Sequence, residues 1–131
     1  MELVAEFAEE SLIKYGTYMD LDKLTDTFNA VKDTSFALVV KDKVQGVLGG
    51  RVITDFCSKN PVYEEVIWYV RKQYRRYGIK LYYFLEQWCK IHEIDRITMS
   101  CMHNSKTDKL MKFYEKMGFT PMETRYIKIL K

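Results

Sequence analysis

Apolar residues recur with a helical period in the first quarter of the chain. The first stretch runs from Leu3 to Ile13, and we expect its helix to end near Gly16. A second stretch begins after Asp20, and either Asp20 or Asp22 can cap it. Its apolar residues lie on one face, at Leu21, Leu24, Phe28 and Val31. The pattern therefore predicts two amphipathic helices.

The next three segments have the composition of β-strands. SFALVV at 35–40 and VQGVLGGRVI at 44–53 flank an Asp42-Lys43 turn, and together they predict a hairpin. The loop TDFCSKNP follows. VYEEVIWYV at 62–70 is then typical of a strand, because it consists mainly of β-branched and aromatic residues. Two adjacent acids, Glu64 and Glu65, interrupt its apolar run.

The rest of the chain alternates between helix and strand. The basic segment RKQYRRYGIK is expected to be a loop, and LYYFLEQWCKIH at 81–92 predicts a helix with a buried stripe. RITMSCM alternates as a strand does. SKTDKLMKFYEKMG predicts a helix that ends at Gly118, and FTPMETRYIKIL predicts a closing strand. This order predicts an α/β domain of three layers, with one domain over residues 1–131.

Composition narrows the class of protein. The net charge of +3 is mild and by itself points to neither nucleic acid nor membrane. Three cysteines at wide spacing predict neither a disulfide scaffold nor a metal site. The acidic N-terminal segment lacks the features of a signal peptide, and no apolar run is long enough to span a bilayer. We therefore expect a cytoplasmic protein in a reducing compartment.

The junction between the 62–70 strand and the 81–92 helix carries the strongest chemical signal. A loop that enters a helix presents unpaired backbone N–H groups, and with the helix dipole these form an anion site. Gly78 removes a side chain where a phosphate would approach the backbone. Five cations surround it: Arg71, Lys72, Arg75, Arg76 and Lys80. A diphosphate is the natural partner of such a site.

This junction resembles the diphosphate loop of the GNAT superfamily of N-acetyltransferases. The matching positions are Val70, Tyr74, Arg75 and Gly78, whereas Lys80 stands where the pattern expects Gly or Ala and Arg76 replaces a frequent Gly. A second segment, LMKFYEKMGF, resembles the C-terminal signature of the superfamily and lies roughly 35 residues later. The resemblance covers about residues 36–131; the N-terminal part departs, because the family usually begins with a strand.

The resemblance implies a GNAT fold, a central mixed sheet flanked by helices, and acetyl-CoA as co-substrate without a metal. The backbone of Trp68, Tyr69 and Val70 would hold the pantetheine arm and the thioester. The diphosphate would bind at Arg75, Arg76, Tyr77, Gly78, Ile79 and Lys80. Either Asn104 or Thr107 would contact the cofactor from the start of the last helix.

The resemblance also implies the catalytic groups. A carboxylate takes the proton of the amine, and by the family's spacing Glu64 matches best, with Glu65 the runner-up. Neighbouring residues of a strand point to opposite faces, and a solvent-facing role for either acid stays open. Tyr114 would protonate the departing sulfur. His92 and His103 are expected to be structural.

The expected function is transfer of an acetyl group from acetyl-CoA to an amine of a protein or small molecule. The sequence is similar to small stand-alone acetyltransferases of bacteria and phages. We expect a monomer or homodimer, with no membrane and no nucleic-acid partner. Two alternatives stay open: a GNAT-fold binding module that has lost its chemistry, and a Mom-type modifier of DNA bases. The sequence does not identify the acceptor.

Overall fold

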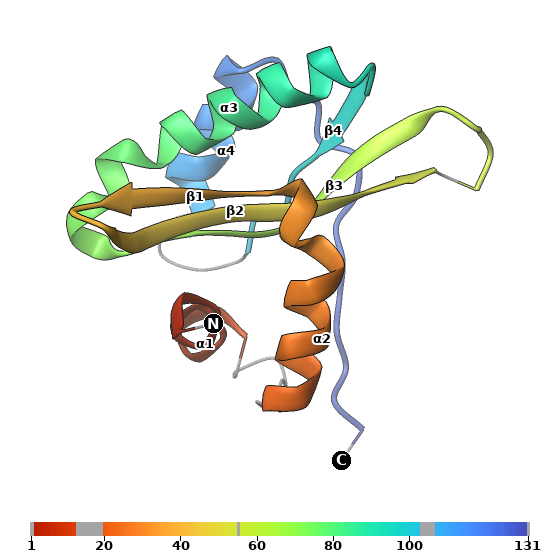
Figure 1. Cartoon of the computed structure of the whole chain (residues 1–131). Helices are drawn as coiled ribbons and strands as arrows, with labels where there is room; N and C mark the ends of the chain where they lie inside the picture. The colour runs from red at the N-terminus through yellow and green to blue at the C-terminus, as the bar shows by residue number, and fades with distance from the viewer. Residues whose placement is uncertain (1, 13–19, 55, 103–106, 131) are drawn as a thin grey trace.

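The computed structural model describes residues 2–12, 20–54, 56–102 and 107–130. A four-stranded sheet lies at the centre, with α1 and α2 on one face and α3 and α4 on the other (Figure 1). The elements are α1 (Glu2–Ser11), α2 (Leu21–Val31), η2 (Lys32–Thr34), β1 (Ser35–Val40), β2 (Lys43–Thr54), β3 (Pro61–Val70), η3 (Lys72–Tyr77), α3 (Gly78–Ile91), β4 (Arg96–Thr98) and α4 (Thr107–Lys116). The predicted three-layer α/β architecture is confirmed.

The sheet has the order β1-β2-β3-β4 and is mixed. The first three strands are antiparallel, and β4 runs parallel to β3. The hairpin between β1 and β2 turns at Lys41 and Asp42, both of which have positive φ, one residue earlier than predicted. Two consecutive residues of this conformation match the twist of the flanking strands.

Two clusters of buried side chains hold the layers together. The larger lies between the sheet and α3, where Leu48, Tyr63, Tyr82, Leu85 and Cys89 are completely or almost completely buried. The smaller joins the other face to α1 through Leu3, Ile67 and Tyr69. The helical period predicted for the N-terminal segment therefore serves to pack α1 against β3.

Several predicted termini agree with the structure. Asp20 caps α2, because its side chain accepts a hydrogen bond from the Lys23 N–H at 2.9 Å. Gly118 follows α4 with φ of 90°, a conformation that favours glycine. The predicted end of the first helix near Gly16 lies outside the described residues.

Four predictions of local structure were wrong. Residues 72–77 form a 3-10 helix instead of a loop, and α3 begins at Gly78 instead of residue 81. The strand predicted over 96–102 is paired only from Arg96 to Thr98. Residues 119–130 form no strand. A β-rich composition expresses only a tendency, and without a partner strand its backbone hydrogen bonds are not made.

None of the helices in the described part of the chain is long and apolar enough to cross a membrane. Across residues 2–12, 20–54, 56–102 and 107–130, no group of three or more His, Cys, Asp or Glu side chains is placed to hold a metal ion.

Candidate active site

The sheet opens where β3 and β4 stop pairing. Their parallel register joins Val62 to Arg96 and ends with Glu64 opposite Thr98. Beyond this point β3 continues to Val70 and stays paired with β2 on its other side. Along residues 65–70 one edge of β3 therefore has no strand beside it in the described structure. The opening lies on the side where α4 approaches.

A β-bulge decides which face of the sheet each side chain of β3 points to. On β2, Gly49 and Gly50 pair with Ile67 and Glu65, which leaves Val66 as the extra residue of β3. An added Cβ on Gly50 would collide with the Glu64 carbonyl oxygen, so the bulge needs a glycine opposite it.

The bulge reverses the alternation of side chains along β3. Before it, Tyr63 packs on the α3 side of the sheet. After it, Val70 packs on that side with Trp68 against it, and Ile67 faces α1. Glu65 thus shares a face with Tyr63 and Trp68 instead of with Ile67.

Glu65 is a buried carboxyl group beside the opening, with only 8% of its surface exposed. Burial raises its pKa to about 8, and a backbone hydrogen bond from Ser100 partly opposes this shift. Such a group is neutral below pH 8 and becomes a strong proton acceptor above it. Carboxyl groups with a perturbed pKa are candidates for acid–base chemistry.

Tyr114 projects from α4 to the same place. Its side chain is 8% exposed, and its hydroxyl donates a hydrogen bond of 2.7 Å to the Ser100 carbonyl oxygen. Burial is the main cause that raises the pKa of Tyr114, and Glu65 raises it further when its carboxyl is ionised, so the hydroxyl keeps its proton at all ordinary pH values. Trp68 and Phe113 pack beside it, with ring centroids 5.6 Å apart.

The backbone of Ser100 therefore connects Glu65 and Tyr114. Its N–H donates to the Glu65 carboxyl group, and its carbonyl oxygen accepts from the Tyr114 hydroxyl. Sequence reasoning missed Ser100. Its contribution comes from the main chain, which no residue type reveals.

Glu64 lies on the opposite face of β3 from Glu65. It accepts a hydrogen bond from Arg51 at 2.9 Å, an ion pair that is partly exposed to solvent. The structure thus brings Glu65, and not Glu64, together with Tyr114.

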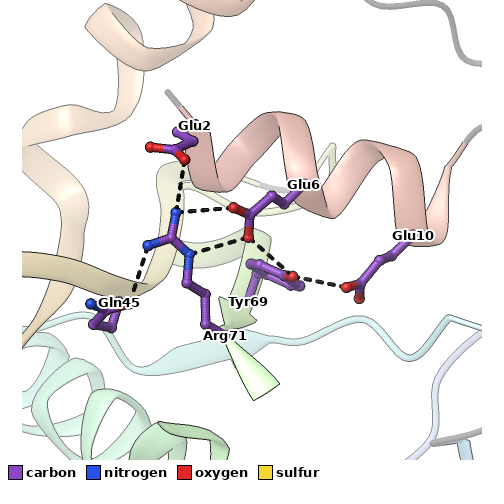
Figure 2. A network of polar contacts seen from close by, with 6 residues as sticks. All are labelled: Glu2, Glu6, Glu10, Gln45, Tyr69 and Arg71. Atoms are coloured by element: carbon purple, nitrogen blue, oxygen red, sulfur yellow. Dashed lines mark hydrogen bonds and ion pairs between the residues drawn. The ribbon is translucent and has the colours of Figure 1, made fainter. Parts of the chain in front are cut away.

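The basic segment after β3 is partly neutralised by acidic side chains of α1. Arg71 bonds to Glu6 at 2.9 Å and lies 3.3 Å from Glu2, and it also donates to the Gln45 side chain (Figure 2). The hydrogen bond between Arg71 and Glu6 lowers the pKa of the glutamate and raises that of the arginine. Arg71 therefore anchors α1 to the end of β3.

Arg75 also turns toward the body of the protein. It donates to the Val70 carbonyl oxygen at 2.9 Å and pairs with Glu10 at 3.3 Å. The Tyr69 hydroxyl donates to Glu10 as well, at 2.9 Å (Figure 2). Of the five cations predicted to surround an anion site, Arg71 and Arg75 are thus paired with acids of α1 in this structure. The acids of α1 that bind them were not recognised from sequence, because the two segments are about 65 residues apart.

The three other cations of the segment are Lys72, Arg76 and Lys80. The Arg76 guanidinium and the Lys80 amine lie 4.7 Å and 5.2 Å from the centre of the Tyr77 ring. No side chain caps α3 at Tyr77, although the Gly78 N–H already donates to the Arg75 carbonyl oxygen. Ile79 is partly exposed at the start of α3.

Two further predicted contacts concern the start of α4. Thr107 is the first residue of this helix, and its hydroxyl donates to the Met102 carbonyl oxygen at 2.8 Å. Asn104 and His103 lie outside the described residues.

The sequence matches the model of the acetyltransferase (GNAT) family over residues 2–119. The chain belongs to the GNAT family. The match includes the N-terminal helices, which the resemblance found from motifs alone did not cover. A comparison with curated proteins gave no significant match.

Solved structures of GNAT acetyltransferases share this fold. One is an aminoglycoside acetyltransferase from an uncultured soil metagenomic sample, in complex with trehalose, which is 18% identical with a TM-score of 0.73. The match covers 99% of this chain and 87% of the aminoglycoside acetyltransferase. Ribosomal-protein-alanine N-acetyltransferase from Brucella melitensis biovar Abortus 2308 is 14% identical, with a TM-score of 0.73 and coverage of 98% and 88%.

A third structure, AAC(6')-Iy in complex with the bisubstrate analogue CoA-S-monomethyl-acetylneamine, is 15% identical with a TM-score of 0.62 and coverage of 87% and 82%. The chain spans 65% of the length of another soil-derived aminoglycoside acetyltransferase. At these identities the likeness establishes the fold and leaves the acceptor open.

Proposed function

We propose that this GNAT protein moves the acetyl group of acetyl-CoA to the nitrogen of an amine acceptor. The observation that carries the proposal is the meeting of Glu65 and Tyr114 at the backbone of Ser100, where β3 and β4 separate. This is one buried proton acceptor and one buried proton donor beside an open strand edge. Amine acylation needs both, because one proton must leave the nitrogen and one must reach the sulfur.

The co-substrate would lie along the open edge of β3. In this proposal the backbone of Trp68, Tyr69 and Val70 holds the pantetheine arm, since hydrogen-bonding groups on that edge have no neighbouring strand in the described structure. The diphosphate binds at the start of α3, between Arg75 and Lys80. Lys72, Arg76 and Lys80 supply positive charge there, while Arg71 and Arg75 hold α1 in place. Thr107 contacts the cofactor from α4.

The reaction follows from this placement. The amine nitrogen attacks the carbonyl carbon of the thioester and its proton passes to the Glu65 carboxylate. The carbon–sulfur bond breaks, and the Tyr114 hydroxyl gives its proton to the sulfur. The products are an N-acetyl amine and the free thiol of CoA. The proton held by Glu65 returns to Tyr114 through solvent, which restores both groups.

The buried position of Glu65 supports this role over Glu64. The charge of Glu64 is already paired with Arg51 on the other face of the sheet. The ion pairs of Arg71 and Arg75 also weigh against a nucleic-acid site, because they engage two of the five cations such a site would use.

The proposal is tested by release of CoA thiol from acetyl-CoA in the presence of aminoglycosides, polyamines and peptide α-amines, followed by mass spectrometry of the acceptor. We expect at least one amine to gain 42 Da only when enzyme and acetyl-CoA are both present. Failure of CoA to bind in calorimetry at millimolar concentration would remove the proposal altogether.

Gly78 provides a separate test of the cofactor site. Its φ is −60°, and an added Cβ would lie 3.4 Å from Val70 Cγ2, which is an ordinary contact. A single added Cβ therefore fits there without a clash. We expect Gly78→Val to weaken CoA binding at least about tenfold, because its branched side chain would occupy the place of the diphosphate. A melting curve shows that the variant is folded.

Gly118→Ala is the matched control for this variant. At φ of 90° alanine is strained, so this change should lower the melting temperature and leave CoA binding intact. Unchanged CoA affinity in Gly78→Val would place the diphosphate elsewhere.

A further inference from the structure

The Arg75 side chain is held from several sides. Its Nε donates a hydrogen bond of 2.9 Å to the carbonyl oxygen of Val70, the last residue of β3. Its Nη2 lies 3.3 Å from a carboxylate oxygen of Glu10, on α1. Its guanidinium carbon lies 5.8 Å from the centre of the Tyr69 ring. This side chain of η3 therefore ties the segment after β3 both to that strand and to the N-terminal helix.

Glu10 is itself held in place where α1 meets the sheet. Its other carboxylate oxygen accepts a hydrogen bond of 2.9 Å from the Tyr69 hydroxyl (Figure 2). The position of α1 does not depend on Glu10, because this helix also packs in the smaller core cluster and Arg71 binds Glu6 at 2.9 Å. Removing the charge of Glu10 therefore leaves α1 anchored and releases the Arg75 guanidinium.

The segment that Arg75 fixes makes mainly local contacts. None of residues 72–77, all of which the structure describes, is buried. The Tyr74 N–H donates to the Arg71 carbonyl oxygen at 2.8 Å, and the Gly78 N–H donates to the carbonyl oxygen of Arg75. The hydrogen bonds of a 3-10 helix have poorer geometry than those of an α-helix, so such a segment gains from a side-chain anchor. Arg75 provides that anchor.

We propose that Glu10 is a positioning residue for the co-substrate: through Arg75 it holds residues 71–78 in the shape that receives the diphosphate of CoA. The inference rests on the proposed function, which places the diphosphate between Arg75 and Lys80. The route is short, because Glu10 binds the guanidinium of Arg75 and the carbonyl oxygen of the same arginine accepts from the Gly78 N–H. Glu10 acts through this arginine and not through contact with CoA.

The direction of the change in affinity separates positioning from simple electrostatics. CoA is an anion with a diphosphate and a ribose phosphate, so the loss of a nearby negative charge by itself strengthens its binding. Loss of positioning has the opposite effect, because the segment then spends part of its time in shapes that do not bind the diphosphate. We expect Glu10→Gln to weaken CoA binding by about three- to thirtyfold.

Calorimetry with CoA tests the route through Arg75. Glu10→Gln, Arg75→Gln and the double variant form a cycle with the wild type. If Glu10 acts through Arg75, its substitution should no longer weaken CoA binding once residue 75 is Gln. Glu9→Gln is the matched control, because it removes the same charge from an exposed residue of the same helix. Its CoA affinity should equal that of the wild type or slightly exceed it.

Hydrogen exchange without CoA gives a second readout, which does not depend on the proposed function. Backbone N–H groups of residues 72–78 should exchange at least about threefold faster in Glu10→Gln than in the wild type, while those in the middle of α3 stay unchanged and show that the variant is folded.

Three results would overturn the inference and leave the proposed function standing: CoA binding that is equal or tighter in Glu10→Gln, a loss of the same size in the Arg75→Gln background, or equal exchange of residues 72–78 in both proteins. A wild type that does not bind CoA would remove the proposed function, and the role of Glu10 toward CoA with it. Faster exchange in Glu10→Gln would even then show that Glu10 holds this segment.

Discussion

Replacing Glu65 by Gln is expected to abolish acetyl transfer and at the same time to stabilise the fold at neutral pH. The loss of rate should be on the order of 10²–10⁴-fold, because the amide does not accept the proton of the amine. The gain in stability follows from burial, which raises the pKa of the carboxyl to about 8 from 4.5. Gln keeps the shape of the side chain without that penalty.

The sign of the stability effect follows from proton binding. Below pH 4.5 the carboxyl is protonated in both the folded and unfolded chains, so Glu65 costs nothing. Between pH 4.5 and about 8 the unfolded chain releases the proton while the folded chain retains it, and stability falls as pH rises. At pH 7 the difference is on the order of 2–4 kcal/mol. Above about pH 8 this difference in the free energy of unfolding no longer changes with pH.

Urea unfolding from pH 5 to pH 9 measures this effect, and Glu64→Gln is the matched control. That variant removes an exposed ion pair with Arg51, so its stability should change by less than about 1 kcal/mol and it should keep its activity. For the wild type, kcat should rise with pH toward a plateau above about 8, as the carboxylate forms. A gain for Glu65→Gln that does not grow with pH would contradict the burial argument. Full activity in that variant would remove Glu65 as the base.

Tyr114→Phe is expected to slow turnover by roughly ten- to a thousand-fold, because it removes the proton donor for the leaving sulfur. CoA affinity should change little, since the ring and its packing against Trp68 remain. The Ser100 carbonyl oxygen loses its hydrogen bond, which should cost about 1–3 kcal/mol of stability. Steady-state kinetics and calorimetry with CoA measure the two effects separately.

Tyr63→Phe is the matched control for Tyr114→Phe. Its hydroxyl also donates to a backbone carbonyl, that of Thr34 at 2.6 Å, and it comes from a buried tyrosine. Both variants should lose stability, but only Tyr114→Phe should lose kcat. Equal kcat in the two variants would make Tyr114 a structural residue.

Local sequence patterns predicted most of the helices and strands of this protein. The helical period after Asp20, the β-branched runs of β1 to β3 and the glycine after α4 all act over a few residues, so their patterns predicted the elements correctly. The two motifs also pointed to the GNAT family, which the match over residues 2–119 establishes. The second motif also named Tyr114 as a catalytic candidate, a role that stays a prediction, and its place in a helix follows from neighbours in the chain.

Only the tertiary structure decided how distant segments meet. Simple alternation places Glu65 on the face of Ile67, and only the bulge at Val66, visible in the pairing with β2, turns it toward Tyr114. The acids of α1 engage Arg71 and Arg75 because folding brings Glu6 and Glu10 beside them. Residues 119–130 have the composition of a strand but no partner in the described sheet. Strand register, ion pairing and strand pairing depend on residues far apart in the chain, so local sequence patterns do not predict them.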